Sequence, residues 1–348
     1  MHLTETLQAL LHPGARLDRN RARQLMGQIL ADREGGIPDA QIAALLALLA
    51  GRTLTAEELT GFAEAMRAAA VPIPLSDDER SQLVDTCGTG GDGSGTFNIS
   101  TAAALVAAAA GAKIAKHGNR ALSSRCGSAD VLDALGVPTA LPAEEAAACL
   151  RTTGFAFLFA PLFHPAMQRV QPVRRALGIR TVFNLLGPLS NPAHAPAQVL
   201  GVYRADLVRV MGQTMAALDI RHGLVVHGAG GLDEFSLSGE TEFAEVRNGQ
   251  VTLHRFHPED AGLQSAPVES LSGGDAAANA AILRGILTGE TGPRRNIVVL
   301  NAAAALMVAG VAPDMAAGVK RAQTAIDSGT AARTLAALVE FGRTDTCR

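Results

Sequence analysis

Residues 85–101 read DTCGTGGDGSGTFNIST, and this glycine-rich stretch decides how the rest of the chain is interpreted. Five of the eight residues from Gly88 to Gly95 are glycine. Because glycine has no side chain, such a backbone can fold tightly and turn several N–H groups toward an anion. Ser100 and Thr101 are residue types that cap the start of a helix, where negative charge is also favoured. The stretch therefore predicts a phosphate-binding loop that leads into a helix.

Two other nucleotide sites fit this stretch less well. Gly88, Gly90 and Gly93 satisfy the G-x-G-x-x-G pattern, but a dinucleotide fold also needs an acidic residue about 20 positions further on, at the end of the next strand. Here that strand is expected to end in Lys116 and His117. No Gly-Lys-Ser/Thr follows the loop, which argues against a Walker-type site. A flexible loop without a ligand stays the alternative interpretation.

A second stretch of small polar residues, 116–136, reads KHGNRALSSRCGSADVLDALG. It offers a lysine, several hydroxyl groups and another helix start at Ser128, all of which can hold phosphate oxygens. We therefore expect a second phosphate-binding loop that faces the same crevice as the first. A solvated strand end is the alternative for Lys116 alone, although two of the three lysines of the chain, Lys113 and Lys116, lie at or just before the start of this stretch.

The composition is that of a globular protein with a large apolar core. The chain has 348 residues, 48% hydrophobic and 18% charged, with a net charge of -3, which allows roughly two domains and excludes disorder. Phenylalanine occurs 11 times, tyrosine once and tryptophan not at all, and no basic tail is present. We therefore expect binding neither to nucleic acid nor to membranes.

The cysteines and the apolar stretches indicate an intracellular, water-soluble protein. The four cysteines show neither zinc-ligand spacing nor a disulfide pattern, and the N-terminal residues lack the pattern of a secretory signal. We therefore expect a cytoplasmic protein. The apolar stretches 102–112 and 297–312 are too short or too interrupted to span a bilayer comfortably, and they predict buried helices.

The hydrophobic pattern divides the chain into a helical part and an α/β part. Apolar residues recur at helical spacing from Thr4 to about Ala70, and the proline- and acid-rich residues 72–78 then predict a linker. Beyond it, short aliphatic runs alternate with helical segments, which predicts an α/β domain with a central, mostly parallel sheet flanked by helices. The expected strands are 82–85, 113–115, 198–202, 223–227 and 251–254, and the expected helices are 101–110, 129–135, 144–151, 207–218, 275–287 and 294–309.

Two further segments carry charged residues of functional interest. Asp233 and Glu234 lie in HGAGGLDEFSLSGE, residues 227–240, and adjacent carboxylates in a loop can bind magnesium, although such a pair is more often a solvated turn. Pro172 and Gly178 bound a short helix with two adjacent arginines on different faces. Arg174 can face inward and bind a carboxylate with two hydrogen bonds. A surface position is expected for Arg175 and is the alternative for Arg180.

Residues 88–101, 116–136 and 171–192 together resemble the anthranilate phosphoribosyltransferase family. The third block reads QPVRRALGIRTVFNLLGPLSNP, and the order and spacing of the blocks agree with the family over essentially the whole chain. The resemblance implies a nucleoside phosphorylase/phosphoribosyltransferase-like fold, with a helical domain at 1–75 that includes about 165–190 and an α/β domain at 80–348. It also implies Mg²⁺ dependence, a homodimer joined through the helical domains and a place in tryptophan biosynthesis.

The reaction implied is transfer of the phosphoribosyl group of 5-phosphoribosyl 1-pyrophosphate (PRPP) to the amine of anthranilate. N-(5-phosphoribosyl)anthranilate and pyrophosphate are the products. By the same resemblance, the PRPP-binding residues would be Gly88, Gly91, Asp92, Thr96, Asn98, Ile99, Ser100, Thr101, Lys116, Ser123, Ser124 and Ser128. Asn119 and Arg174 would hold anthranilate, with His117, His164, Gly187 and Pro188 lining its path and Gly118 and Arg120 completing the substrate-binding set. Lys116 and Arg174 would be catalytic, and Ser100, Asp233 and Glu234 would bind Mg²⁺.

The sequence departs from the family pattern at few positions, and each rival function lacks a feature that it would require. Cys126 stands where small or charged residues are common and Asp133 where glutamate is expected, both outside the assigned contact set. A pyrimidine nucleoside phosphorylase of the same fold would need no pyrophosphate site, whereas both loops are present here. A non-enzymatic nucleic-acid-binding relative would need a basic surface and degraded motifs, whereas this chain is slightly acidic with its motifs intact.

Overall fold

The computed structural model describes residues 3–32, 36–121 and 125–345. At its centre lies one seven-stranded sheet with the order β3-β2-β1-β4-β5-β6-β7. The first five strands in this order are parallel, and β6 and β7 add an antiparallel hairpin at one edge. The predicted fold class is therefore confirmed. The strands are β1 (Leu83–Asp85), β2 (Lys113–Gly118), β3 (Phe155–Phe159), β4 (Ala197–Gly201), β5 (His222–Gly228), β6 (Thr241–Arg247) and β7 (Gln250–Phe256).

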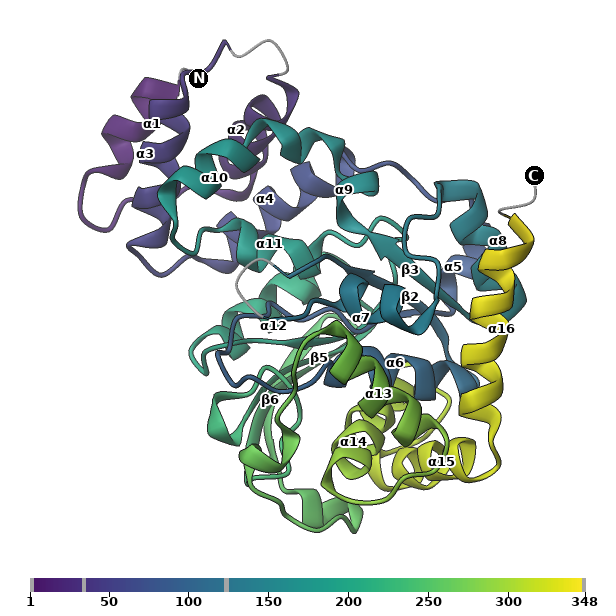
Figure 1. Cartoon of the computed structure of the whole chain (residues 1–348). Helices are drawn as coiled ribbons and strands as arrows, with labels where there is room; N and C mark the ends of the chain where they lie inside the picture. The colour runs from purple at the N-terminus through teal and green to yellow at the C-terminus, as the bar shows by residue number, and fades with distance from the viewer. Residues whose placement is uncertain (1–2, 33–35, 122–124, 346–348) are drawn as a thin grey trace.

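Different helices cover the two faces of the sheet (Figure 1). Because successive side chains of a strand point to opposite faces, neighbours in β4 and β5 belong to different apolar clusters. Val199 and Val226 join the cluster that contains α6 (Ile99–Ala109) and α14 (Pro293–Val308). Leu200 and Val225 join the cluster of α12 (Leu207–Ala217) and the N-terminal helices. The sheet thus separates two cores.

The apolar stretches 102–112 and 297–312 form buried helices, as expected. All residues of α6 from Thr101 to Ala108 are buried, and so are all residues of α14 from Ile297 to Leu306. A helix that is apolar on every side is stable only when it is surrounded, and these two helices pack against each other under the sheet. Within the described ranges, no helix combines the length and apolarity needed to cross a membrane.

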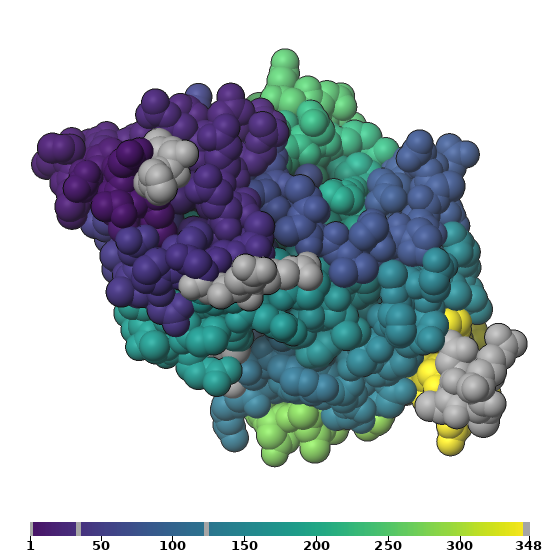
Figure 2. All heavy atoms as spheres, turned by 90° about the horizontal axis from the view of Figure 1, so that it is seen from above, coloured from purple at the N-terminus to yellow at the C-terminus, as the bar shows by residue number. Residues whose placement is uncertain are grey.

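The N-terminal helices form a bundle that a middle segment of the chain completes. The bundle consists of α1 (Leu3–Leu10), α2 (Arg19–Ala31), α3 (Asp39–Ala50) and α4 (Ala56–Ala68), and α4 begins with a capping box between Thr55 and Glu58. After β3 the chain returns to this bundle through α9 (Ala160–Phe163), a 3₁₀ turn (Pro165–Arg169), α10 (Gln171–Leu177) and α11 (Phe183–Leu189). The returning segment packs on α2, α3 and α4. In Figure 2 the purple N-terminal residues accordingly touch teal residues from mid-chain. The division at residues 75–80 stays a prediction that these contacts support.

Some elements differ from the expected set. β3 and β6 were not expected: FAFLF is too short an apolar run to distinguish from a helix, and the two glutamates of β6 disfavour a strand. The expected linker is shorter, because a capping box at Ser76 starts α5 (Asp77–Ser81). The remaining helices are α7 (Ser128–Leu135), α8 (Ala143–Thr153), α13 (Ala276–Leu287), α15 (Met315–Asp327) and α16 (Thr330–Asp345).

The strand order places a crevice at the carboxyl end of β1. From β1 the chain adds β2 and β3 on one side, and it then crosses to add β4 and β5 on the other side. Loops that follow neighbouring strands diverge at such a point, which is where open α/β sheets bind their ligands. The glycine-rich loop follows β1, so the fold places it at this crevice.

Candidate functional site

A cavity of about 570 Å³ lies at the carboxyl ends of β1, β2, β4 and β5 and extends to the helical bundle. It brings together every predicted site residue that the structure describes, from five separate segments of the chain. Ser123 and Ser124 lie outside the described residues. The predicted residues lining the cavity are Gly88, Gly91, Asp92, Thr96, Asn98, Ile99, Ser100, Thr101, Lys116, His117, Gly118, Asn119, Arg120, Ser128, His164, Arg174, Gly187, Pro188, Asp233 and Glu234.

The glycine-rich loop uses backbone conformations that other residues rarely adopt. Gly90, Gly91, Gly93 and Gly95 all have positive φ, which explains why this loop is built of glycine. Thr89 N donates to Gly201 O at 2.8 Å. Among the described residues, the N–H groups of Gly91, Asp92 and Gly93 donate to no acceptor. The loop therefore offers several backbone donors to an anion, as predicted.

The helix after this loop begins two residues earlier than expected. α6 starts at Ile99, so Asn98 occupies the cap position and Ser100 and Thr101 lie in the first turn. The Asn98 side chain makes no capping hydrogen bond, because its amide donates to Cys126 O at 3.2 Å and its oxygen accepts from Asn279 at 2.9 Å. The predicted capping role of Ser100 and Thr101 is therefore wrong. Both residues still line the cavity at a helix N-terminus.

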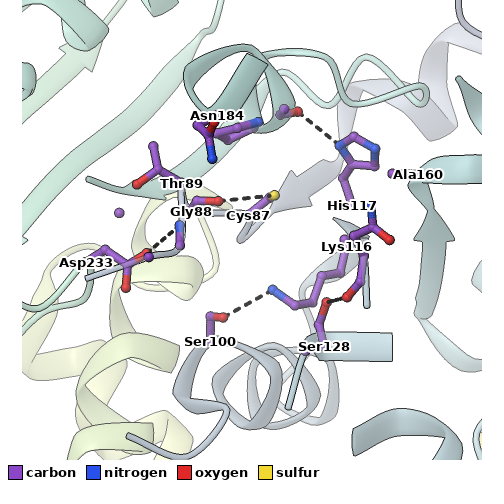
Figure 3. Close-up of a pocket in the computed structure, with 18 of the residues that line it drawn as sticks. Cys87, Gly88, Thr89, Ser100, Lys116, His117, Ser128, Ala160, Asn184 and Asp233 are labelled. Atoms are coloured by element: carbon purple, nitrogen blue, oxygen red, sulfur yellow. Dashed lines mark hydrogen bonds between the residues drawn. The ribbon is translucent and has the colours of Figure 1, made fainter. Parts of the chain in front are cut away.

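Lys116 forms the buried floor of the cavity. Its side chain leaves β2 with only 2% of the residue exposed. Nζ donates to Thr86 O at 2.9 Å and to Thr86 Oγ1 at 3.1 Å, and it lies 3.4 Å from Ser100 Oγ. Figure 3 shows Lys116 pointing to Ser100, whereas His117 points in another direction. The cation thus lies beneath both the β1 loop and the start of α6, and the alternative of a solvated strand end is wrong.

Asp85 is a buried carboxylate that sequence reasoning missed. It is 0% exposed at the end of β1, and its Oδ1 accepts from His117 N at 3.1 Å. Its Oδ2 has no hydrogen-bond partner among the described residues. Burial raises the pKa of Asp85 to about 6, against the opposing effect of Asn191 and Lys116. Its position directly before the glycine-rich loop was the available signal.

Asp92, Asp233 and Glu234 form an acidic group opposite Lys116. Asp233 Oδ2 accepts from Gly90 N at 2.8 Å, and Glu234 Oε1 accepts from Ser100 N at 3.1 Å. Burial and then the Asp92 charge raise the pKa of Asp233 to about 7. Burial and the Asp233 charge raise the pKa of Glu234 well above its usual value. Crowded carboxylates of this kind gain stability from a cation.

Glycines bring the acidic loop against the sheet. A Cβ at Gly201 would lie 1.6 Å from Asp233 O, so only glycine permits this approach at the end of β4. After Glu234, the Asn301 side chain accepts from Phe235 N at 2.9 Å and donates to Phe235 O at 3.0 Å.

The oxygen donors of Ser100, Asp233 and Glu234 suit Mg²⁺. Within the described ranges no group of three or more His, Cys, Asp or Glu side chains is arranged to hold a metal ion.

His117 and His164 line the side of the cavity nearest the helical bundle. Their ring centroids are 5.1 Å apart, and the residues are 3% and 5% exposed. Burial lowers the pKa of His117 to about 3 and that of His164 to about 4. His117 Nδ1 lies 3.1 Å from Gly187 O, and because a carbonyl only accepts, Nδ1 carries the proton. Its Nε2 has no partner among the described residues and is therefore an available acceptor.

These two histidines predict a pH dependence of stability. Because their folded pKa values lie below the value of about 6.5 in the unfolded chain, protons bind preferentially to the unfolded protein as the pH falls below 6.5. Each histidine is expected to lower the free energy of unfolding by roughly 2 kcal/mol between pH 7 and pH 5. Urea unfolding of the wild type and of a His117→Gln/His164→Gln variant at both pH values measures this contribution. An equal pH dependence of the two proteins would contradict it.

Arg174 and Arg180 approach the cavity from the segment between β3 and β4. α10 spans Gln171–Leu177 and ends at Gly178, which has φ 62°, as the sequence predicts. The Arg174 guanidinium lies 5.3 Å from the centre of the Phe183 ring and makes no ion pair or hydrogen bond among the described residues. Arg175 is exposed, as expected. Arg180 is also exposed, but it lines the cavity and donates to Gly91 O, so a purely surface role for it is wrong.

Arg120 and Ser128 hold the second loop together. Arg120 pairs with Asp130 at 3.0 Å and with Asp133 at 2.6 Å. Gly127 N donates to Asp130 Oδ2 at 2.9 Å at the start of α7, and Ser128 Oγ donates to Asn119 O at 3.2 Å. The Arg120 guanidinium is thus already occupied by two carboxylates. Asp133 therefore contacts a predicted site residue, although the sequence placed it away from the contact set.

Comparisons with known proteins agree with this geometry. Residues 80–332 match the model of the glycosyl transferase family α/β domain, and residues 4–70 match the helical bundle domain of the same family. The anthranilate phosphoribosyltransferase of Desulforamulus reducens is 48% identical, over 98% of this chain and 97% of that protein. The one from Chloroflexus aggregans is 50% identical, over 99% of both chains.

Solved structures give the same result. The crystal structure of anthranilate phosphoribosyltransferase from Thermus thermophilus superposes with a TM-score of 0.89 at 44% identity and covers 99% of this chain and 100% of that one. The enzyme from Saccharomyces cerevisiae in complex with PRPP and Mg gives a TM-score of 0.86 at 28% identity and covers 98% of both chains. The resemblance inferred from the three sequence blocks is thereby confirmed, and the chain belongs to the anthranilate phosphoribosyltransferase family.

Proposed function

We propose that this protein transfers the phosphoribosyl group of PRPP to the amine of anthranilate, the reaction for which its relatives are named. The observation that carries the proposal is which groups line a single cavity. Free backbone donors of a glycine-rich loop and an arginine without a carboxylate partner in the described chain face the same space. A phosphate-rich donor and an aromatic acid are the two ligands that such a pair of sites accepts.

The donor side is assigned to the two loops and the start of α6. Among the described residues the N–H groups of Gly91, Asp92 and Gly93 have no acceptor, so the oxygens of a phosphate could accept their hydrogen bonds. Lys116 lies beneath this region and supplies positive charge from a nearly water-free position. The second loop offers Asn119 and Ser128 beside the cavity. Ser123 and Ser124 are proposed donors on the family pattern alone.

Mg²⁺ fits the remaining oxygen donors, and Ser100, Asp233 and Glu234 would hold it. Burial and repulsion among the neighbouring acids raise the pKa values of Asp233 and Glu234, and a bound cation would offset both effects. Two carboxylates and a hydroxyl suit magnesium, which usually keeps substrate phosphate oxygens and water among its other ligands. When bound, the ion neutralises charge on the departing pyrophosphate.

The acceptor side is assigned to the segment that returns to the helical bundle. Arg174 presents a planar guanidinium that can take a carboxylate in two hydrogen bonds. Asn119, Gly187 and Pro188 line the same cavity as Arg174, and His117 Nε2 offers an acceptor to an amine N–H. The yeast relative has been solved in complex with 4-fluoroanthranilate.

The mechanism proposed is displacement at C1 of the ribose through an oxocarbenium-like transition state. As the bond to pyrophosphate lengthens, positive charge grows on the sugar and negative charge grows on the leaving group. The loop N–H groups and Lys116 stabilise the negative charge, and the two binding sites hold amine and sugar in line. An arylamine is unprotonated at neutral pH, so the attack needs no strong general base and no covalent nucleophile, and the proton that the nitrogen loses after attack passes to pyrophosphate or to water.

We also propose a homodimer joined through the helical domains, on the family pattern. Light scattering after size-exclusion chromatography is expected to give about twice the chain mass of 35.8 kDa. A mass equal to one chain at micromolar concentration would contradict the dimer.

The direct test of the function is the fluorescence of anthranilate. Purified protein is expected to abolish it when PRPP and Mg²⁺ are both present, and to leave it unchanged when either is omitted. Phosphate-dependent release of base from pyrimidine nucleosides would instead support the nucleoside phosphorylase. Nucleic-acid binding without either reaction would support the non-enzymatic relative.

A further inference from the structure

We propose that Arg180 is a positioning residue that fixes the glycine-rich loop in its donor-binding shape before PRPP arrives. This inference rests on the proposed function and adds a residue to which no role has been given. Arg180 lies between α10 and α11 on the acceptor side of the cavity, whereas its contact, Gly91, lies on the donor side. It is therefore placed to connect the two sides.

The Arg180 guanidinium is held from behind by an aromatic ring. Its central carbon lies 4.2 Å from the centre of the ring of Tyr203, the one tyrosine in the sequence. A flat guanidinium stacked on a ring at this distance keeps its orientation and loses little rotational freedom on making a hydrogen bond. Tyr203 follows β4 by two residues, so the ring is itself anchored to the sheet.

In this orientation Arg180 donates from Nη2 to Gly91 O. The fit is close, because a Cβ at Gly91 would lie 3.2 Å from the same Nη2. Since C=O and N–H of one peptide unit point in opposite directions, holding Gly91 O on one side turns the N–H of Asp92 to the other. That N–H is one of the loop donors without a partner in the described chain. Arg180 therefore sets the direction of a proposed phosphate contact.

The segment around the end of β4 supports the loop at two points. Thr89 N donates to Gly201 O at 2.8 Å, and Gly91 is held through Arg180 on Tyr203. Between and beyond these points the loop consists largely of glycine, whose ordering has a high entropic cost. A loop fixed in advance binds its ligand more tightly, because less order must be imposed on binding.

The test is a double-mutant cycle on donor binding. Calorimetry with PRPP and Mg²⁺ is expected to show about tenfold weaker binding for Arg180→Gln and for Tyr203→Leu. The double variant is expected to lose little more than either single variant, because the ring and the guanidinium act as one unit. Tyr203→Phe keeps the ring and is expected to bind like the wild type. Arg175→Gln is the matched control, since Arg175 is an exposed arginine outside the cavity.

A second readout separates positioning from simple charge attraction. Positioning predicts a higher KM for PRPP with kcat within about twofold of the wild type, and only partial rescue by Arg180→Lys, which keeps the charge without the flat fork. Full rescue by lysine, or normal donor binding by Tyr203→Leu, would overturn the proposal. Thermal unfolding must show that each variant is folded. If Tyr203→Leu does not fold, Arg180→Gln alone carries the test. Wild-type protein that fails to bind PRPP would overturn the proposed function as well, whereas tight binding by wild type and Arg180→Gln alike would overturn only this inference.

Discussion

Replacement of both Asp233 and Glu234 by alanine is expected to lower kcat by at least about a thousandfold and to abolish the response to magnesium. The physical reason is the leaving group, because pyrophosphate departs only when its growing negative charge is neutralised. Both carboxylates line the cavity with Ser100, and burial together with repulsion among the acids raises their pKa values. Initial rates measured across a magnesium titration test this expectation. Glu240→Ala is the control, since it removes an acid from the same loop outside the cavity.

Replacement of the same two residues leads to a second expectation, which concerns stability. Burial and mutual repulsion disfavour the ionised forms in the folded state, so the neutral pair Asp233→Asn/Glu234→Gln is expected to raise the Tm of the metal-free protein near pH 8. This advantage disappears as the pH falls toward the pKa values of the unfolded chain, about 4. An unchanged magnesium response in the alanine variant, or a lower Tm in the amide variant, would count against a metal-binding role.

Arg174→Ala is expected to raise the KM for anthranilate by about a hundredfold and to leave PRPP binding within about twofold of the wild type. A desolvated guanidinium–carboxylate pair with two hydrogen bonds contributes roughly 3 kcal/mol, which corresponds to this factor. Burial lowers the pKa of Arg174, yet a guanidinium stays charged at neutral pH, so its charge is available to a ligand. Steady-state kinetics with each substrate varied, together with calorimetry for PRPP, give the two values.

The controls for this variant come from the same helix. Arg174→Lys keeps the charge but cannot form the forked contact, and it is expected to recover only part of the affinity. Arg175→Ala removes the adjacent arginine, which is exposed, and is expected to leave both constants unchanged. Equal losses for anthranilate and PRPP in Arg174→Ala would place this arginine in a general structural role.

The features that the sequence predicts well are those with local causes. The glycine-rich loop is recognisable because positive φ values demand glycine, and the helix of Arg174 is bounded by Pro172 and Gly178. The alternation of apolar runs and helical segments predicts the α/β class, since a buried parallel strand is apolar throughout. The roles of the individual site residues stay predictions that the experiments above test.

The features that the sequence misses have long-range causes. Nothing near Arg180 indicates that it meets Gly91, because that contact joins residues 89 positions apart. Asp85 looks like an ordinary strand end until the fold buries it beside His117. Ser100 and Thr101 are good capping residues, but the side-chain contacts of Asn98 with Cys126 and Asn279 accompany an earlier helix start. In each case tertiary contacts outweigh a local preference.

The return of the chain to the helical bundle between β3 and β4 has an evolutionary consequence. Arg174, Gly187 and their neighbours all belong to this single uninterrupted insert, whereas the glycine-rich loop and the acidic loop follow β1 and β5. Changes within the insert, other than at Arg180, can therefore alter which nucleophile is admitted while the glycine-rich loop and the acidic loop that serve the activated sugar stay intact. This insert is therefore the segment in which substitutions are best placed to change the choice of nucleophile.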